Sequence, residues 1–409
     1  MMQTKLTPDQ LLYYLFCGAF FVMPFGTTPF TVLGLCILLV WFVTGQFFKA
    51  RNQYMRGAWF WPVAAMVVLT WLGLIWSADP GGLGLKYAKK THYWLYALAL
   101  GGMGLSGKSS AHLMKAFFGG LGINAFVAFL QAAGLVPTFA VFGERYYTGF
   151  HSGYNTLAIL LILGMLTASF YFRRAEGYKP RLAYGCIMVI YFVHLILLAS
   201  RGAYVTFLVL SPVLVVNILH GRKIRFMLLA YLFVIGLMFS SPVVRDRVSF
   251  SVKAVQSHLK EGGEFASGKK YSYHIDRIYM WRWAIDLFLE HPVLGVGTGG
   301  YYKAILSKGG DAGIAHPHNI MLYVAVSWGI IGILVCGWFF WVLLKAGWQH
   351  RDHIFGFFIL SSVLVILVGG MSNTHILDSG GAFLLALTTG LASALPMLKP
   401  ESASMGTEA

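Results

Sequence analysis

The feature that most constrains this chain is a series of apolar runs, each about long enough to cross a lipid bilayer. The hydrocarbon core of a bilayer is spanned by about 20 predominantly apolar residues of α-helix. We therefore expect an all-α, polytopic membrane protein with about twelve transmembrane helices. These cover residues 10–24, 29–48, 59–77, 91–106, 113–134, 153–172, 182–199, 203–219, 226–242, 318–346, 354–371 and 381–398.

The composition supports a membrane protein and argues against a nucleic-acid partner. The chain is 57% hydrophobic and 11% charged, with a mean hydropathy of +0.68, whereas soluble domains are about 25% charged. Its formal charge of +16 fits basic cytoplasmic loops and anionic membrane lipids. The four cysteines all lie in apolar runs, and their spacing does not indicate a metal site.

The distribution of basic residues predicts the orientation. With both termini in the cytoplasm, the loops on that side hold sixteen Lys and Arg residues, and the short loops opposite hold five. Positive charge favours the cytoplasmic side, so the long hydrophilic loop faces the periplasm of a bacterium. The expected organisation is nine transmembrane helices in 1–242, a periplasmic loop domain in 243–317, three helices in 318–398 and a cytoplasmic tail in 399–409.

The long loop is expected to contain helices and to carry the chemistry. Residues 279–289 have the apolar spacing of an amphipathic helix, and a glycine-rich turn follows at 295–300. The turn has a G-x-G-x-x-G pattern, but no parallel sheet is predicted around it, so a dinucleotide site is not expected. The loop ends at His316-Pro317-His318-Asn319, directly before an apolar helix.

Three arginines are candidates for an anion site. Arg201, in Ser200-Arg201-Gly202, interrupts an apolar stretch, and a charge at membrane depth indicates function unless it reaches the head groups. Arg277 and Arg282 precede and lie within the amphipathic helix. Each alone is compatible with a solvated face. Because the planar guanidinium suits a pyrophosphate, the three together favour an anion site.

His318 is the candidate general base, because nearby arginines would keep its imidazole neutral. The alternative is a histidine that caps the helix. His316 and His318 form an H-x-H pair without further ligands at zinc spacing, so no metal site is predicted. Asn319 is expected to orient a ligand or the backbone. Asp378 and Lys86 lie in other loops on the same side, where they can line the same cavity.

Several of these residues form motifs of a known family. His318-Asn319, nine residues and Gly329-Ile-Ile-Gly332 resemble the motif of the O-antigen ligase (WaaL) family. Within the wider O-antigen ligase and polymerase superfamily, Ser200-Arg201-Gly202 resembles the serine-arginine-glycine element before a helix. The R-x-x-x-W helix and P-x-x-G-x-G turn of that superfamily resemble 277–281 and 292–297.

The resemblance implies a GT-C-type fold and a metal-independent, cofactor-free, inverting glycosyltransferase in the bacterial inner membrane. Such a lipopolysaccharide ligase moves O-antigen from undecaprenyl diphosphate to a sugar of lipid A–core at the periplasmic face. His318 would be the catalytic base, and His316, Asn319 and Asp378 would support it. The diphosphate would be bound by Arg201 and Arg277, with Arg282 and Lys86 as secondary contacts.

Other functions remain open at this point. An O-antigen polymerase uses the same donor with another lipid-linked glycan as acceptor, and protein O-oligosaccharyltransferases share the motifs. A transporter for the lipid-linked glycan would carry charges along a path between the two sides of the membrane. Here the candidate residues gather on one side, which favours an enzyme.

Overall fold

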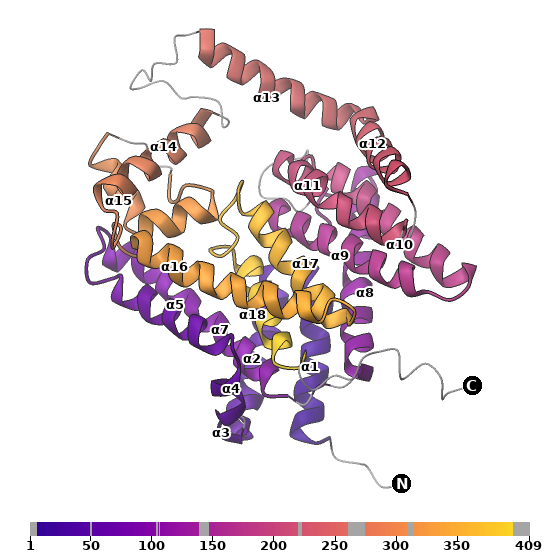
Figure 1. The fold of residues 1–409 in the computed structure, drawn as a ribbon, viewed down its shortest axis with the longest axis horizontal. Helices are drawn as coiled ribbons and strands as arrows, with labels where there is room; N and C mark the ends of the chain where they lie inside the picture. Colours follow the sequence, from indigo (N-terminus) through magenta and orange to yellow (C-terminus); the bar gives the residue numbers. More distant parts are fainter. Residues whose placement is uncertain are drawn as a thin grey trace.

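The computed structural model describes residues 6–49, 51–103, 105, 107–138, 147–219, 223–260, 275–309 and 314–395, and these contain helices and no strand (Figure 1). The all-α prediction is therefore confirmed for this part of the chain. The first half comprises α1 (Pro8–Val22), η1 (Met23–Phe25), α2 (Thr27–Val43), α3 (Gln46–Lys49), α4 (Arg51–Arg56), α5 (Phe60–Leu72), η2 (Pro80–Gly84), α6 (Leu85–Lys89), η3 (Lys90–Tyr93), α7 (Trp94–Gly101), α8 (Gly107–Ala132) and α9 (Tyr154–Arg174). The second half comprises α10 (Tyr178–Leu197), α11 (Arg201–Ile218), α12 (Ile224–Ser240), α13 (Pro242–Lys260), α14 (Ile275–Glu290), α15 (Tyr301–Leu306), α16 (Ile320–Gln349), α17 (Ile354–Gly369) and α18 (Ser379–Ala392).

Several of these helices can cross a membrane. Among the described residues, five are long and apolar enough, and six if the bent pair α12 and α13 counts as one span. Helices α2, α5, α17 and α18 are apolar but shorter. Each predicted span overlaps a helix, and the last one runs beyond the described residues. The structure therefore agrees with a polytopic membrane protein, while the number twelve and the GT-C arrangement stay predictions.

The core is built around α9, α17 and α18. Helix α9 is buried on all sides from Thr156 to Phe170, as expected of a helix whose whole circumference is apolar. It packs against α10, α11 and α17, and α17 packs against α18. The segment before α9 and the loop between α17 and α18 are thus held at the end of a rigid core, and both carry polar residues.

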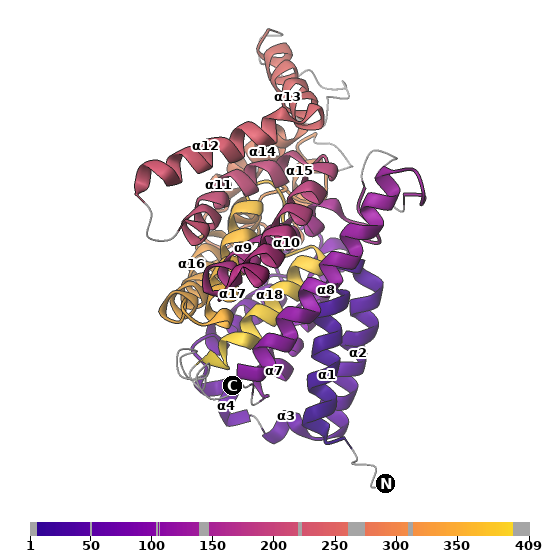
Figure 2. The same ribbon diagram turned by 90° about the vertical axis from the view of Figure 1, so that its right-hand side faces the viewer.

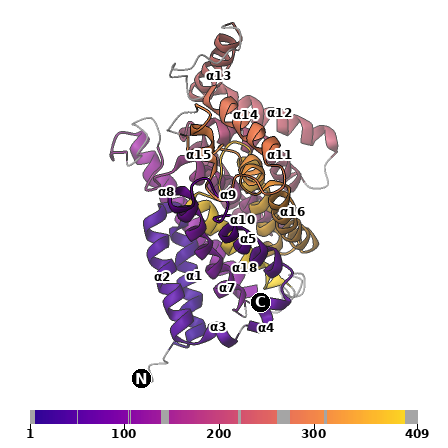
Figure 3. The same cartoon turned by 90° about the vertical axis from the view of Figure 1, so that its left-hand side faces the viewer.

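The predicted periplasmic segment contributes α13, α14 and α15 in the structure. The chain bends by 82° between α12 and the first part of α13. Helices α13 and α14 lie at one end of the molecule, and α3 and α4 lie at the other (Figures 2 and 3). Helix α14 packs against α16, and Trp281 of α14 contacts Pro317 in the turn before α16.

Helix α16 is interrupted at Gly329, the first glycine of the motif after His318. Gly329 has φ +62° and ψ −151°, a conformation that is essentially restricted to glycine. The break lets the Ile330 amide donate to the carbonyl of Pro292 over 2.8 Å. The amide of Val296 donates to the carbonyl of Val326, also over 2.8 Å. The glycine-rich turn therefore docks into the break, which gives these motif residues a structural role.

We expect Gly329→Ala to destabilise the protein strongly. A Cβ at this position would lie 2.3 Å from the carbonyl oxygen of Val293, and the backbone disfavours any side chain. Strain of this kind costs about 1–3 kcal/mol before the clash is added. Thermal unfolding in detergent measures the loss. The control is Gly337→Ala, in the same helix, because nothing lies within 4 Å of its added Cβ. Equal melting temperatures of the two variants would contradict the structural role of Gly329.

Candidate functional site

His318 lies in a strained turn immediately before α16. Its φ of +49° is in the left-handed region, and such strain clusters at functional sites. The amide of His318 donates to Nδ1 of His316 over 3.3 Å. Asn319 caps the helix, because its Oδ1 accepts from the amides of Met321 and Leu322. Asn319 therefore holds the first turn of α16, and its role in orienting a ligand or the backbone for the reaction stays a prediction.

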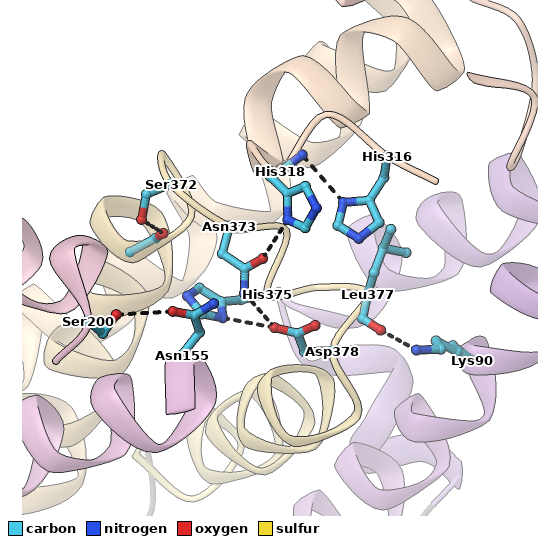
Figure 4. Close-up of polar contacts among 11 residues, drawn as sticks. Lys90, Asn155, Ser200, His316, His318, Ser372, Asn373, His375, Leu377 and Asp378 are labelled. Carbon is cyan, nitrogen blue, oxygen red and sulfur yellow. Dashed lines mark hydrogen bonds and ion pairs between the residues drawn. The ribbon is translucent and has the colours of Figure 1, made fainter. Parts of the chain in front are cut away.

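A chain of polar contacts joins His318 to Asp378 (Figure 4). Nδ1 of His318 lies 3.3 Å from Oδ1 of Asn373, and Nδ2 of Asn373 donates to Oδ2 of Asp378 over 2.8 Å. Nδ1 of His375 lies 3.3 Å from the same carboxylate oxygen. Asn373 is only 6% exposed. The structure thus brings His318, His316 and Asp378 together and adds Asn373 between them.

The environment keeps both histidines of the turn neutral at pH 7. Burial lowers the pKa of His318, and the charge of Arg277 lowers it further. Burial and the neighbouring His318 lower the pKa of His316 to about 3. For Asp378, burial raises the pKa, but the contact with His375 and the charge of Lys90 hold it below its ordinary value. The site therefore combines neutral imidazoles with an ionised carboxylate.

Arg201 begins α11, next to a second strained residue. Ala199 has φ +49°, and Ser200 caps the helix by accepting from the amide of Ala203 over 3.4 Å. The Ser200 hydroxyl also donates to Oδ1 of Asn155, at the start of α9, over 3.1 Å. These contacts fix the turn, and Arg201 is half-buried at the end of the core.

Arg201 lines two adjoining cavities. The arginine cavity has a volume of about 520 Å³ and is lined by Tyr154, Asn155, Ala199, Ser200, Arg201, Gly202, Val205, Thr206, Val209, Arg247, Arg277, Trp281, Val368, Met371 and Ser372. The histidine cavity, of about 660 Å³, is lined by Thr27, Lys90, His151, Ser152, Gly153, Tyr154, Asn155, Thr156, Arg201, Arg247, His316, His318, Asn373, Leu377, Asp378, Ser379 and Gly380. Arg201 and Arg247 line both cavities, so the two cavities adjoin at these arginines.

Helix α14 links the arginine cavity to the histidine turn. Arg277 lines the arginine cavity. Trp281, one turn later, donates from Nε1 to the carbonyl of Pro317 over 3.0 Å. The R-x-x-x-W pattern thus supplies a cation and a residue that holds the turn before His318.

Two predicted phosphate ligands are not brought into these cavities. Arg282 lies on an exposed part of α14, and Lys86 is exposed on α6; neither lines the arginine or the histidine cavity. Lys90, one turn after Lys86, does line the histidine cavity and donates to the carbonyl of Leu377. The roles of Arg282 and Lys86 stay predictions.

The structure also adds residues that our site prediction omitted. Arg247 comes from α13 and lines both cavities, whereas Arg245 of the same helix is exposed and lines neither. His151 and Asn373 line the histidine cavity. Arg247 lies in the long hydrophilic loop, but no sequence pattern distinguishes it from Arg245. Within the described residues, no group of three or more His, Cys, Asp or Glu side chains has the arrangement of a metal site.

The comparison with known protein families covers part of this site. Residues 186–337 match the family model described as O-antigen ligase. The matched segment includes Arg201, Arg277, His318 and the glycines of the α16 break; Lys86 and Asp378 lie outside it. No curated protein matches the chain. The predicted resemblance to the O-antigen ligase family and its superfamily is therefore confirmed over residues 186–337.

Proposed function

We propose that the protein is an O-antigen ligase that transfers O-antigen polysaccharide from undecaprenyl diphosphate to a sugar of lipid A–core. The observation that carries this proposal is the position of His318 in a cavity whose wall, through Arg201, is shared with an arginine-lined cavity. A general base for the acceptor and a cationic site for the donor diphosphate are thus adjacent. In this proposal the site faces the periplasm of the bacterial inner membrane, and 243–317 form the periplasmic loop domain.

His318 acts on the acceptor. Its Nε2 takes the proton of the acceptor hydroxyl as the hydroxyl oxygen forms a bond to the anomeric carbon of the donor sugar. The bond from that carbon to the diphosphate oxygen breaks on the opposite face, so the configuration inverts. Undecaprenyl diphosphate leaves with the electron pair, and the proton passes from His318 to water. Base catalysis of this kind contributes about 10²–10⁴-fold to the rate.

The arginines act on the donor. Arg201, Arg247 and Arg277 line one cavity, and their guanidinium groups suit the diphosphate oxygens, on which negative charge grows as the bond breaks. Fixed positive charges at this point support a metal-independent, cofactor-free reaction. Arg282 and Lys86 would contact the lipid-linked substrate only outside the two cavities.

The apolar part of the arginine cavity fits the first units of an isoprenoid chain. Val205, Val209 and Val368 line it together with Met371. The valines at 205 and 209 are 59% and 55% exposed on α11, a helix that is apolar and long enough to span a membrane. A lipid tail can therefore extend from the arginines along α11 into the bilayer.

An O-antigen polymerase is the second candidate and a protein O-oligosaccharyltransferase the third, because both use the same donor chemistry. The acceptor distinguishes them. Purified protein receives undecaprenyl-diphosphate-linked glycan, EDTA, and both lipid A–core and a second lipid-linked glycan. Glycan on lipid A–core supports the ligase, and a longer lipid-linked glycan instead identifies a polymerase. Transfer to neither would contradict the proposal and favour a transporter.

We expect transfer to be lost at low pH. Because only the neutral imidazole accepts a proton, activity should fall as the pH drops through the pKa of His318, which burial and the charge of Arg277 hold below its ordinary value. Replacing Arg277 by Gln removes a positive charge near His318 and should move this fall to higher pH. Transfer rates at saturating donor between pH 4.5 and 8.5 test both statements. A fall in activity that stays at the same pH in Arg277→Gln as in the wild type would contradict the role of His318.

A further inference from the structure

We propose that Asn373 is a positioning residue. Its amide bridges Asp378 and His318 and thereby places the basic lone pair of His318 on Nε2. This inference rests on the proposed function, in which His318 is the general base. It assigns a role to the loop between α17 and α18, which lies outside the matched family segment.

The argument begins at the carboxylate. An ionised Asp378 can only accept hydrogen bonds, so the end of Asn373 that contacts it over 2.8 Å must be the NH₂ group. The carbonyl end of the same amide then faces Nδ1 of His318 at 3.3 Å. Because that oxygen can only accept, Nδ1 must carry the proton. In the neutral imidazole, Nε2 is then the nitrogen with the free lone pair.

The contacts of Asn373 with His318 and Asp378, here called the relay, are held in place by several neighbours. Asn373 is 6% exposed, which limits alternative orientations of its amide. His375 lies 3.3 Å from the carboxylate oxygen that Asn373 contacts. Nδ2 of Asn319 donates to the carbonyl of Met371 over 3.1 Å, so the loop that carries Asn373 is tied directly to the turn that carries His318. The contact therefore joins two anchored segments 55 residues apart.

The charged groups around His318 come from several elements, and Arg201 of α11 and Arg247 of α13 line the same cavity. Arg277 of α14 lowers its pKa and Asp378, at the start of α18, raises it. His316 lies in the same turn, with ring centres 4.2 Å apart. Lys90 of η3 acts on His316 and on the carboxylate. Together these groups favour an ionised Asp378 beside a neutral His318, which is the charge state that the relay requires.

Single substitutions should disrupt the hydrogen bonds that fix the tautomer of His318 while His318 itself is kept. In Asn373→Ala, His318 loses the acceptor for Nδ1–H, and we expect kcat to fall at least about 100-fold, since a misdirected tautomer costs up to about 10⁴-fold in a comparable relay. The KM for the lipid-linked donor should change little, because Asn373 does not line the arginine cavity. In Asp378→Asn, the amide of Asn373 is free to turn over, so kcat should also fall.

The exchange of the two residues is the decisive variant. In Asn373→Asp with Asp378→Asn, a carboxylate at 373 accepts directly from Nδ1–H of His318, and the amide at 378 donates to it. The tautomer and the net charge are preserved. We expect kcat to recover at least tenfold over either single variant. The loss of activity at low pH should move to higher pH than in the wild type, because the carboxylate now contacts the imidazole and stabilises its protonated form.

A buried neighbour supplies the control. Thr374 is next in the chain and fully buried, and its hydroxyl makes no hydrogen bond within the described structure; Thr374→Val should keep near-normal kcat. A wild type without glycan transfer would refute the proposed function itself. With an active wild type, near-normal kcat in Asn373→Ala, or a folded exchange variant no faster than the single variants, would overturn the relay. Elution in size-exclusion chromatography and the melting temperature in detergent establish folding. If Asn373→Ala does not fold, the comparison of the exchange variant with Asp378→Asn decides alone.

Discussion

Replacing His318 by Ala or Asn should reduce glycan transfer at least about 1000-fold while the protein stays folded. The loss is large because the acceptor hydroxyl is a weak nucleophile unless a base removes its proton, and base catalysis alone contributes up to about 10⁴-fold. Asn is the more informative replacement. His318 has φ +49°, and asparagine tolerates this left-handed conformation better than most residues, so His318→Asn removes the base with little backbone strain.

The measurement is the single-turnover rate of transfer to lipid A–core at saturating donor. His291→Ala is the matched control, because His291 is exposed at the end of α14 and lines neither cavity. Melting temperature in detergent reports folding. If folded His318→Asn kept a rate within tenfold of the wild type, another group would have to remove the proton.

The second large effect should follow from the arginines of the arginine cavity. Ala in place of Arg201 or Arg277 should lower kcat about 10²–10³-fold, the usual loss when one fixed donor to a developing charge is removed. Lys should rescue each variant only in part, since a point charge cannot form the paired hydrogen bonds of a guanidinium. The rates with undecaprenyl-diphosphate-linked glycan measure these effects.

Helix α13 offers a matched pair for the same test. Arg247 lines both cavities, whereas Arg245 is exposed. We expect Arg247→Ala to slow transfer at least tenfold and Arg245→Ala to leave it near normal. The two variants lose the same charge from the same helix, so equal rates would mean that only the general basicity of α13 matters and that Arg247 has no direct role.

The sequence predicted the helices because apolar runs of membrane length have few alternatives to helix. It also predicted that His318, Arg201 and Asp378 lie on one side, from the loop charges alone. It marked Gly329 as a motif residue but could not predict the break in α16, because the conformation of this glycine depends on the carbonyl groups of the docked turn.

Which arginine faces the site was also beyond prediction from composition. Arg277 and Arg282 are five residues apart, which corresponds to about 140° around a helix, so at most one of them faces a narrow cavity. The packing of α14 on α16 decides that Arg277 does. The contact between Asn373 and His318 is similarly invisible in the sequence, because it depends on how the loop after α17 folds back to the start of α16.

The central claim is that the two adjoining cavities transfer a glycan from a lipid diphosphate. The most direct test gives purified wild type and His318→Asn the undecaprenyl-diphosphate-linked glycan and lipid A–core in the presence of EDTA. We predict glycan on lipid A–core with the wild type and none with the variant. A folded wild type that transfers no glycan, or a variant that transfers as fast as the wild type, would contradict the account.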